Sequence, residues 1–236
     1  MQSYVAAHVP GVAHLTTLND LSLNTHLGIR FLVANLPEIE FPLADMSPRT
    51  IIPCGPMIRP ATPLAEADST LAKWLARAPT VYVNLGTHVR LDEGFAIEMA
   101  TALRIAIDHV NSVLWRDPRL KGLQVLWKLM RSSKGRDAAY EVAKPGCKVY
   151  EILGEDMRED RVRIVEWFDA EPTAVLEAGT VVCAVHHGGA NSFLEAVRYV
   201  LPLLLLSFSL SPEFFSFVFI SILYPHVFPS VHPSFS

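Results

Sequence analysis

The sequence predicts an α/β fold built on a parallel, Rossmann-like sheet with helices on both faces. Two observations support this prediction. Short runs of Val, Leu and Ile alternate along the chain with amphipathic helical patterns, and these runs are nearly continuous in their apolar character. Strands of this kind are buried on both faces, as in parallel sheets joined by crossover helices. With 236 residues, the chain can form one good-sized domain with an ample core.

The first third of the chain changes from irregular to regular patterns. Seven prolines between residues 37 and 63 predict a connector, preceded by a short apolar run at residues 30–35. A helix is expected through Leu71, Trp74 and Leu75, followed by a strand over residues 80–86. A long amphipathic helix is then expected from about Asp92 to residue 109, because acidic residues favour a helix N-terminus.

Three further strands are expected at residues 123–129, 162–167 and 181–186, with a short helix after Pro172. Lys134-Gly-Arg136 is interpreted as a solvated loop between the first two of these strands. Ligands of parallel sheets bind beyond the carboxyl ends of the strands. Four turns therefore become candidates for a binding site: residues 84–87, residues 127–128, the loop at Trp167, and residues 186–192.

The turn at His186-His-Gly-Gly-Ala-Asn-Ser192 has the build of a phosphate cradle. Its glycines let backbone approach an anion closely, and Asn191 and Ser192 stand where the next helix would present free N–H groups. Glu195 lies one helical turn further on and could accept hydrogen bonds from a sugar hydroxyl. Ser192 and Glu195 also fit a capping box, in which the serine is the N-cap of the helix. The motif alone leaves both interpretations open.

Composition excludes several classes of protein. The net charge is −4, the pI is near 6.1, and no basic cluster is present, so we expect no nucleic-acid partner. Cys54, Cys147 and Cys183 lack a CxxC spacing, which argues against a disulfide scaffold or a zinc site. The N-terminus lacks the basic start and apolar core of a signal peptide. We therefore expect a cytoplasmic protein.

Four segments, in order and with matching spacing, resemble the carboxyl-terminal domain of UDP-dependent glycosyltransferases with the GT-B fold. They are Val81-Tyr-Val-Asn-Leu-Gly-Thr87, Val125-Leu-Trp-Lys128, Val162-Arg-Ile-Val-Glu-Trp167 and the segment from His186 to Ala196. The resemblance covers about residues 30–198. It implies that residues 1–65 are the end of an acceptor domain with its linker, and that residues 66–198 bind a UDP-sugar.

The resemblance assigns roles to named residues. Trp167 would stack on uracil, although a core tryptophan is the alternative. Glu195 would hold ribose hydroxyls. The diphosphate would lie against His187, Asn191, Ser192 and the backbone of Gly189, at the positive end of a helix.

Three neighbouring residues complete these assignments. Thr87, beside Gly86, would reach the other phosphate, and an ordinary turn threonine is the equal alternative. His88 is expected to be solvated. His186 would point to the opposite side of its strand from His187, so we interpret it as structural.

The implied reaction is attack by an acceptor hydroxyl on the anomeric carbon of the donor sugar, with UDP leaving. A histidine near the start of the amino-terminal domain supplies the general base in this family, and nothing here matches that motif, so no catalytic residue is assigned. There is no Asp-x-Asp pair, which fits a metal-independent reaction. The UDP-sugar is a substrate, and no cofactor is expected.

The resemblance ends at Tyr199. Residues 199–236 hold one charged side chain, Glu213, and are rich in Phe, Ser, Leu and Pro, which suggests a retained intron or a frame error after Arg198. A strand at residues 201–206 is still possible. A membrane anchor is a weaker interpretation, because Pro212 and Glu213 divide the apolar run. We expect a truncated glycosyltransferase that retains UDP binding; a non-catalytic chain, either an interaction module or a non-folding product, is the alternative.

Overall fold

The structure is a computed structural model that describes residues 8, 30–34, 51–58, 60–112, 117, 120–132 and 140–199, and the backbone of 203–208 and 215–220. The chain divides into two units, Met1–Met57 and Ile58–Ser236. In the first unit, strands β1 (Phe31–Val33) and β2 (Ile51–Pro53) pair in parallel. The expected loop at Lys134–Arg136 lies outside the described residues.

The second unit is built on a six-stranded sheet in the order β5-β4-β3-β6-β7-β8. The first five strands in this order pair in parallel, and β8 pairs antiparallel with β7. The strands are β3 (Thr80–Asn84), β4 (Gln124–Lys128), β5 (Val162–Val165), β6 (Val181–His186), β7 (Leu203–Phe208) and β8 (Phe215–Ile220). The predicted parallel α/β fold is confirmed, and β7 overlaps the strand considered possible at residues 201–206.

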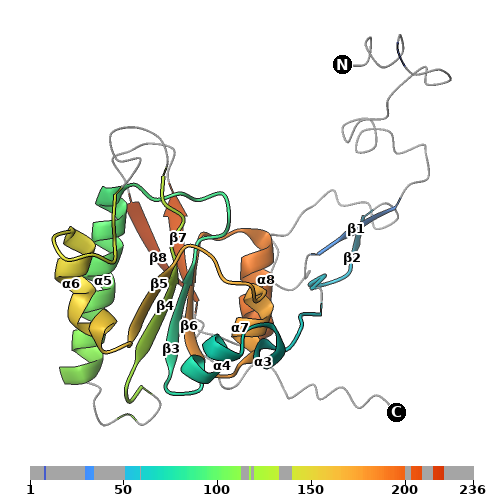
Figure 1. Cartoon of the computed structure of the whole chain (residues 1–236). Coiled ribbons are helices and arrows are strands. Elements are labelled where there is room, and N and C mark those ends of the chain that lie inside the picture. The colour runs from blue at the N-terminus through green and yellow to red at the C-terminus, as the bar shows by residue number, and fades with distance from the viewer. Residues whose placement is uncertain are drawn as a thin grey trace. The chain divides into compact units, whose positions relative to one another are not determined.

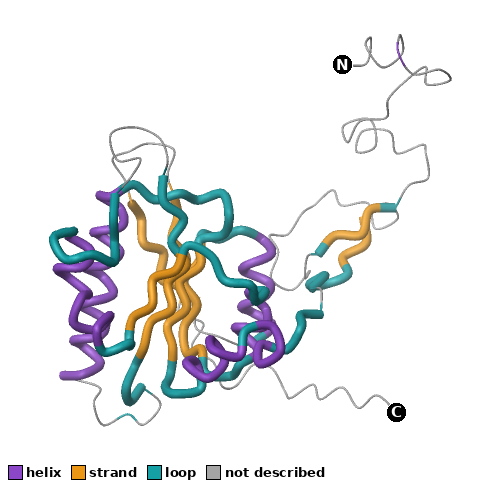
Figure 2. The backbone as a smooth tube through the Cα atoms, in the orientation of Figure 1, coloured by secondary structure: helices purple, strands orange, loops and turns teal. Residues whose placement is uncertain are grey.

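Six helices cover the two faces of this sheet. Helices α5 and α6 lie on one face, and the other four lie on the opposite face (Figure 1). Figure 2 shows the strands as a layer between these two groups of helices. The helices are α3 (Leu64–Ala67), α4 (Ser69–Leu75), α5 (Glu93–Ser112), α6 (Lys148–Arg158), α7 (Pro172–Glu177) and α8 (Ala190–Arg198).

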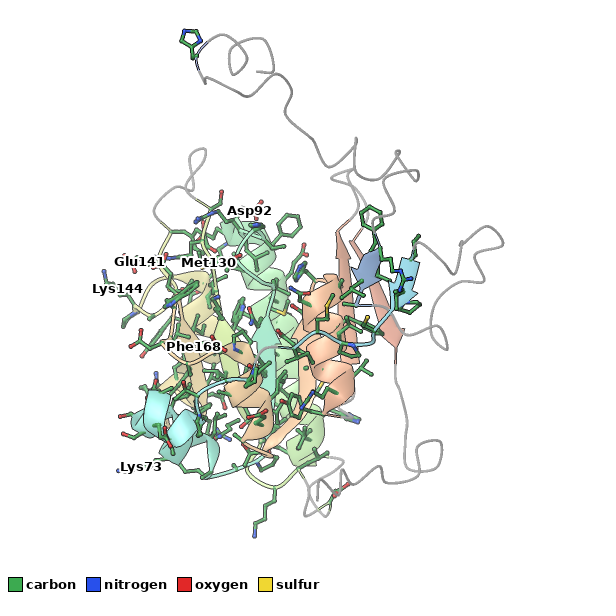
Figure 3. All side chains as sticks on the ribbon, turned by 90° about the vertical axis from the view of Figure 1, so that its right-hand side faces the viewer. Lys73, Asp92, Met130, Glu141, Lys144 and Phe168 are labelled. Atoms are coloured by element: carbon green, nitrogen blue, oxygen red, sulfur yellow. The ribbon has the colours of Figure 1, made fainter. Side chains whose placement is uncertain are left out.

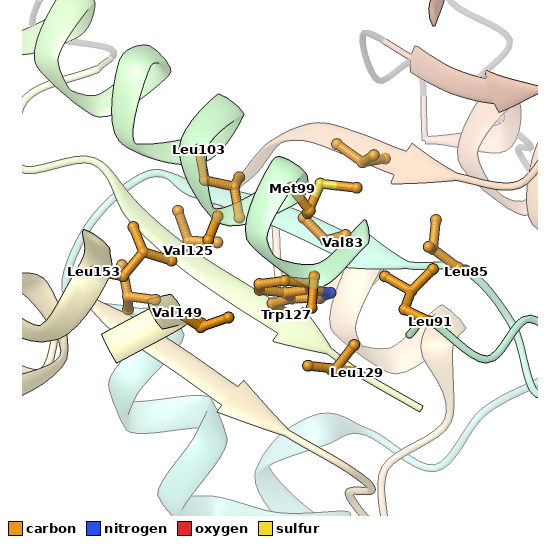
Figure 4. Packing of buried hydrophobic residues seen from close by; sticks show 14 of the residues in the cluster. Val83, Leu85, Leu91, Met99, Leu103, Val125, Trp127, Leu129, Val149 and Leu153 are labelled. Atoms are coloured by element: carbon orange, nitrogen blue, oxygen red, sulfur yellow. The ribbon is translucent and has the colours of Figure 1, made fainter. Parts of the chain in front are cut away.

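Side chains alternate between two cores, one on each face of the sheet, because successive residues of a strand point in opposite directions. In β4, Val125 and Trp127 pack under α5 and α6, whereas Leu126 packs under the other helices. Trp127 is fully buried, and Figure 4 shows it between Val83 and Val149. The sheet is therefore held on both faces, and the edge where its strands end is left for a site.

Helix α6 was missed by the sequence prediction. Its buried residues Val149, Leu153 and Asp156 recur at intervals of three to four, which is the signal of an amphipathic helix. Parallel strands β4 and β5 also require a crossover, which is usually a helix. Asp156 is fully buried and pairs with Arg104 of α5 and Arg161, so one of the recurring core positions is a carboxylate. That polar position weakened the apolar pattern.

Strand ends and helix starts differ slightly from expectation. β3 ends at Asn84 and β5 at Val165, two residues before the predicted ends, because the chain turns away from the ladder there. Helix α5 begins as predicted: the carboxylate of Asp92 accepts a hydrogen bond from the N–H of Phe95 at 2.9 Å. Asp92 and Met130, which follow β3 and β4, lie at the same end of the molecule, away from Lys73 of α4 (Figure 3). This end carries the site.

Candidate functional site

The candidate site is a pocket of about 450 Å³ at the carboxyl edge of the sheet. The chain enters the sheet at β3, adds β4 and β5 on one side, and then crosses to add β6 on the other side of β3. The gap between the ends of β3 and β6 is therefore the topological switch point, where open α/β sheets bind ligands. Seven of the eight predicted residues line this pocket: Gly86, Thr87, His187, Gly189, Asn191, Ser192 and Glu195.

The imidazole of His187 joins the two loops of the switch point. A Cβ atom on Gly86 would stand 2.9 Å from Cε1 of that ring, and a Cβ on Gly189 would overlap Nε2. Gly86 and Gly188 both have positive φ, of 81° and 78°, which glycine adopts without strain. The glycines of both loops thus let the ring lie against the backbone. Gly189 has an extended conformation that any residue can adopt. Glycine is needed there because a side chain would overlap the His187 ring.

Helix α8 points its N-terminus into the pocket. Gly189 is the N-cap, and Ala190, Asn191 and Ser192 form the first turn. Since these residues precede the first intrahelical hydrogen bond, from the N–H of Phe193 to the carbonyl of Gly189, their N–H groups are free to bind an anion. The capping-box interpretation is wrong. Ser192 is the third residue of the helix, and no side chain caps it.

Asn84, the last residue of β3, holds the following loop in place through two side-chain hydrogen bonds. The sequence predicted no role for this residue. The Asn84 amide donates to the hydroxyl of Tyr82 at 2.9 Å and accepts from the N–H of Gly86 at 3.0 Å. Tyr82 is buried, and its pKa is raised mainly by that burial. The hydrogen bond from Gly86 to Asn84 therefore fixes the backbone of Gly86 beside the His187 ring.

The neighbouring histidines of the turn differ in environment. His186 is 3% exposed, and its Nδ1 atom accepts a hydrogen bond from the N–H of Gly188 at 3.1 Å. Burial lowers the pKa of His186 to about 4, with a smaller effect from His187. Burial, and then the charge of His88, lower the pKa of His187. His186 is structural and His88 is exposed, as predicted, although His88 also lines the pocket.

Glu195 lies one turn into α8 on the pocket side of the helix. It is half-buried, and this burial raises the pKa of its carboxyl group. The same side chain also lines a smaller cavity beneath the pocket, together with Tyr82, Asn84 and His186. Its carboxylate is available to the pocket because no described residue forms an ion pair or hydrogen bond with it.

Trp167 is the one predicted site residue that does not line the pocket. It follows the end of β5 and is 60% exposed, so the core-tryptophan interpretation is wrong. Lys128 connects it to the pocket. This residue ends β4, lines the pocket, and places its Nζ atom 3.9 Å from the centroid of the Trp167 ring. The turn at residues 127–128 was recognised from the sequence, but no role was assigned to Lys128.

No group of three or more His, Cys, Asp or Glu side chains in the described part of the chain could hold a metal ion. Within the same residues, every helix is too short or too polar to cross a bilayer. The three cysteines are unpaired.

Three curated proteins have related sequences. Glycosyltransferase sdnJ of Sordaria araneosa is 34% identical over 180 residues, which are 76% of this chain and 32% of that protein. UDP-glycosyltransferase stmC of Aspergillus ustus is 25% identical, over 66% of this chain and 28% of its own. UDP-glycosyltransferase 84B2 of Arabidopsis thaliana is 24% identical over 68% of this chain and 32% of that protein. The chain spans about a third of the length of these relatives. No protein-family model matches the sequence.

Solved structures of plant enzymes are also similar. Phytolacca americana UGT2, complexed with UDP-2fluoro-glucose and pterostilbene, is 21% identical, with a TM-score of 0.49 over 83% of this chain and 39% of that one. A ugt transferase from Siraitia grosvenorii in complex with UDP is 20% identical, with a TM-score of 0.47 over 67% of this chain and 32% of that one.

Proposed function

This chain is a relative of the UDP-glycosyltransferases that spans about a third of their length, and from this premise we propose that its pocket binds the UDP moiety of a UDP-sugar. One observation carries the proposal. Seven residues predicted from two separate loops line a single pocket at the topological switch point of the sheet.

The diphosphate would lie at the N-terminus of α8. Free N–H groups of Ala190, Asn191 and Ser192 and the helix dipole favour negative charge there. His187, whose ring lies between Gly86 and Gly189, would donate a hydrogen bond, and Thr87 would approach from the loop after β3. These groups stabilise the ground state of the bound nucleotide and, more strongly, the charge that develops on departing UDP.

The nucleoside would extend from the cradle across the ends of β3 and β4. Glu195, one turn into α8, would accept hydrogen bonds from the ribose hydroxyls. Trp167 would stack on the uracil, for which its exposed ring is suited. In a complete enzyme the acceptor hydroxyl attacks the anomeric carbon, the bond to the UDP oxygen breaks, and a base removes the hydroxyl proton. We assign no base to this chain.

The rest of the proposal follows the same chemistry. The substrates are a UDP-sugar and a small-molecule acceptor, whose identities are not assigned. The UDP-sugar is consumed in the reaction, and we propose no separate cofactor or metal. The unpaired cysteines support the cytoplasmic location expected from the sequence.

Isothermal titration calorimetry with UDP tests the proposal. We expect saturable binding by the intact chain and its loss in the double variant Ser192→Ala, Glu195→Ala. The matched control is Glu98→Ala, which removes an exposed carboxylate of α5 outside the pocket. Each protein should first show a cooperative thermal transition. A folded chain without measurable UDP binding would remove the functional claim and favour an interaction module.

A further inference from the structure

Lys128 is a buried cation that has no carboxylate partner among the described residues. Only 7% of its surface is exposed, yet no described carboxylate lies within ion-pair distance of it. Glu195 shares the pocket but forms no ion pair with it. Among the described residues, the ammonium group contacts the face of the Trp167 ring, with Nζ 3.9 Å from the ring centroid.

The Trp167 ring alone does not fully stabilise the charge of the Lys128 ammonium group. A buried ammonium group loses its hydration, and a cation–π contact compensates for that loss only in part. Burial accordingly lowers the pKa of Lys128. A structural lysine at such a position would be expected to meet a carboxylate or several carbonyl oxygens. Here Lys128 lines the pocket, and no described residue accepts a hydrogen bond from its ammonium group.

Lys128 is also distinct among the residues that line the pocket. Of the described residues that line the pocket, it alone is a Lys or Arg, and His88 and His187 are the other groups that could become cationic. Burial lowers the pKa of His187, so its imidazole is mainly neutral at pH 7. A doubly charged diphosphate bound only by neutral N–H groups would still lack a full counter-charge.

The strand order puts Lys128 between the two ends of the proposed nucleotide. It ends β4, whereas the cradle follows β6 and Trp167 follows β5. Since β3 separates β4 from β6, the strand ends are about 10 Å apart, two strand spacings. A nucleotide with its phosphates in the cradle and its base on Trp167 passes beside Lys128.

We propose that Lys128 is a specificity-determining residue of the pocket: its ammonium group rests on Trp167 in the unliganded chain and turns to the diphosphate when the nucleotide binds. The inference rests on the proposed function. It assigns to Lys128 the recognition of phosphate charge. Uridine, which lacks phosphates, would gain nothing from this residue.

The test compares UDP with uridine in calorimetric titrations of four proteins: the intact chain, Lys128→Met, Lys128→Arg and Lys121→Met. Lys128→Met should weaken UDP binding by about tenfold or more, the effect of losing one charged contact. Uridine binding should stay within about twofold of its original value. Lys128→Arg, which keeps the charge, should retain most of the UDP affinity. Lys121→Met, an exposed lysine outside the pocket, is the control and should change neither.

Ionic strength provides an independent readout, because it screens charge but not packing. Added salt should weaken UDP binding less in Lys128→Met than in the intact chain. Unchanged UDP affinity in Lys128→Met would overturn the inference while the proposed function stands. Equal losses for UDP and uridine would also overturn it, since Lys128 would then only support Trp167. Absence of UDP binding by the intact, folded chain would instead remove the proposed function itself, and this inference with it.

Discussion

The imidazole of His187, after β6, lies so close to Gly86, after β3, that a Cβ atom on the glycine would stand 2.9 Å from the ring. These residues are 101 positions apart in sequence, and they meet because β3 and β6 are neighbours at the switch point of the sheet. The His187 ring, which is predicted to bind phosphate, can occupy its position only because residue 86 has no side chain.

Gly86→Ala should therefore damage the site more than the fold. Alanine at a φ of 81° costs about 1–2 kcal/mol of stability, and its Cβ would also push the His187 ring away. Gly179→Ala is the matched control, because it has a φ of 74° and nothing within 4 Å of an added Cβ. Chemical denaturation should show similar losses of stability in both variants. Calorimetry should show weaker UDP binding, by about tenfold, in Gly86→Ala alone; equal binding would contradict the role of this contact.

Binding of UDP-glucose should weaken as the pH rises through the histidine range. Burial lowers the pKa of His187 in the free chain, and a diphosphate beside the ring would raise it again. Binding then takes up a proton between these two pKa values, so the affinity falls with rising pH in that window and is level above it. Calorimetry from pH 5 to 8 measures the slope. His187→Asn should abolish this pH dependence, whereas His88→Asn, the control, should retain it. A pH dependence that persists in His187→Asn would show that another group takes up the proton.

Trp167→Ala should reduce affinity without reducing stability. The ring is 60% exposed, so its removal takes little from the core, whereas loss of a stacked base costs roughly 1–3 kcal/mol. We expect UDP and uridine binding to weaken by about tenfold or more, and Trp167→Phe to retain part of the affinity. Ile105→Ala, at an exposed apolar position of α5, controls for removal of surface area. Unchanged uridine binding in Trp167→Ala would rule out stacking.

His186 should make the fold sensitive to acid. Its pKa is about 4 in the folded chain and 6.5 as a free side chain, so the unfolded state takes up a proton first. The free energy of unfolding should fall by about 3 kcal/mol as the pH drops from 6.5 to 4, and no part of this effect remains above pH 6.5. Urea titrations measure the loss. His186→Asn keeps an acceptor for the N–H of Gly188 and should lack this dependence, whereas His109→Asn, an exposed histidine of α5, should match the parent chain.

The apolar patterns were sufficient for the parallel sheet, because a strand buried on both faces leaves a continuous run of Val and Leu in the sequence. They were not sufficient for α6, where the buried ion pairs of Asp156 interrupt the pattern. Ser192 shows the limit for short motifs. The sequence suits both a helix cap and a first-turn residue, and only the backbone of Gly189 decides that the helix begins earlier.

By itself the sequence determined the fold class, the turns that end the parallel strands, and the candidate residues on them, since each depends on local patterns of apolar residues, glycines and polar side chains. The tertiary structure alone decided which turns meet. It brought Gly86 to His187 by placing β6 beside β3, and it put Lys128 on Trp167 by placing β4 beside β5. Strand order follows from packing over the whole sheet, and no local pattern encodes it.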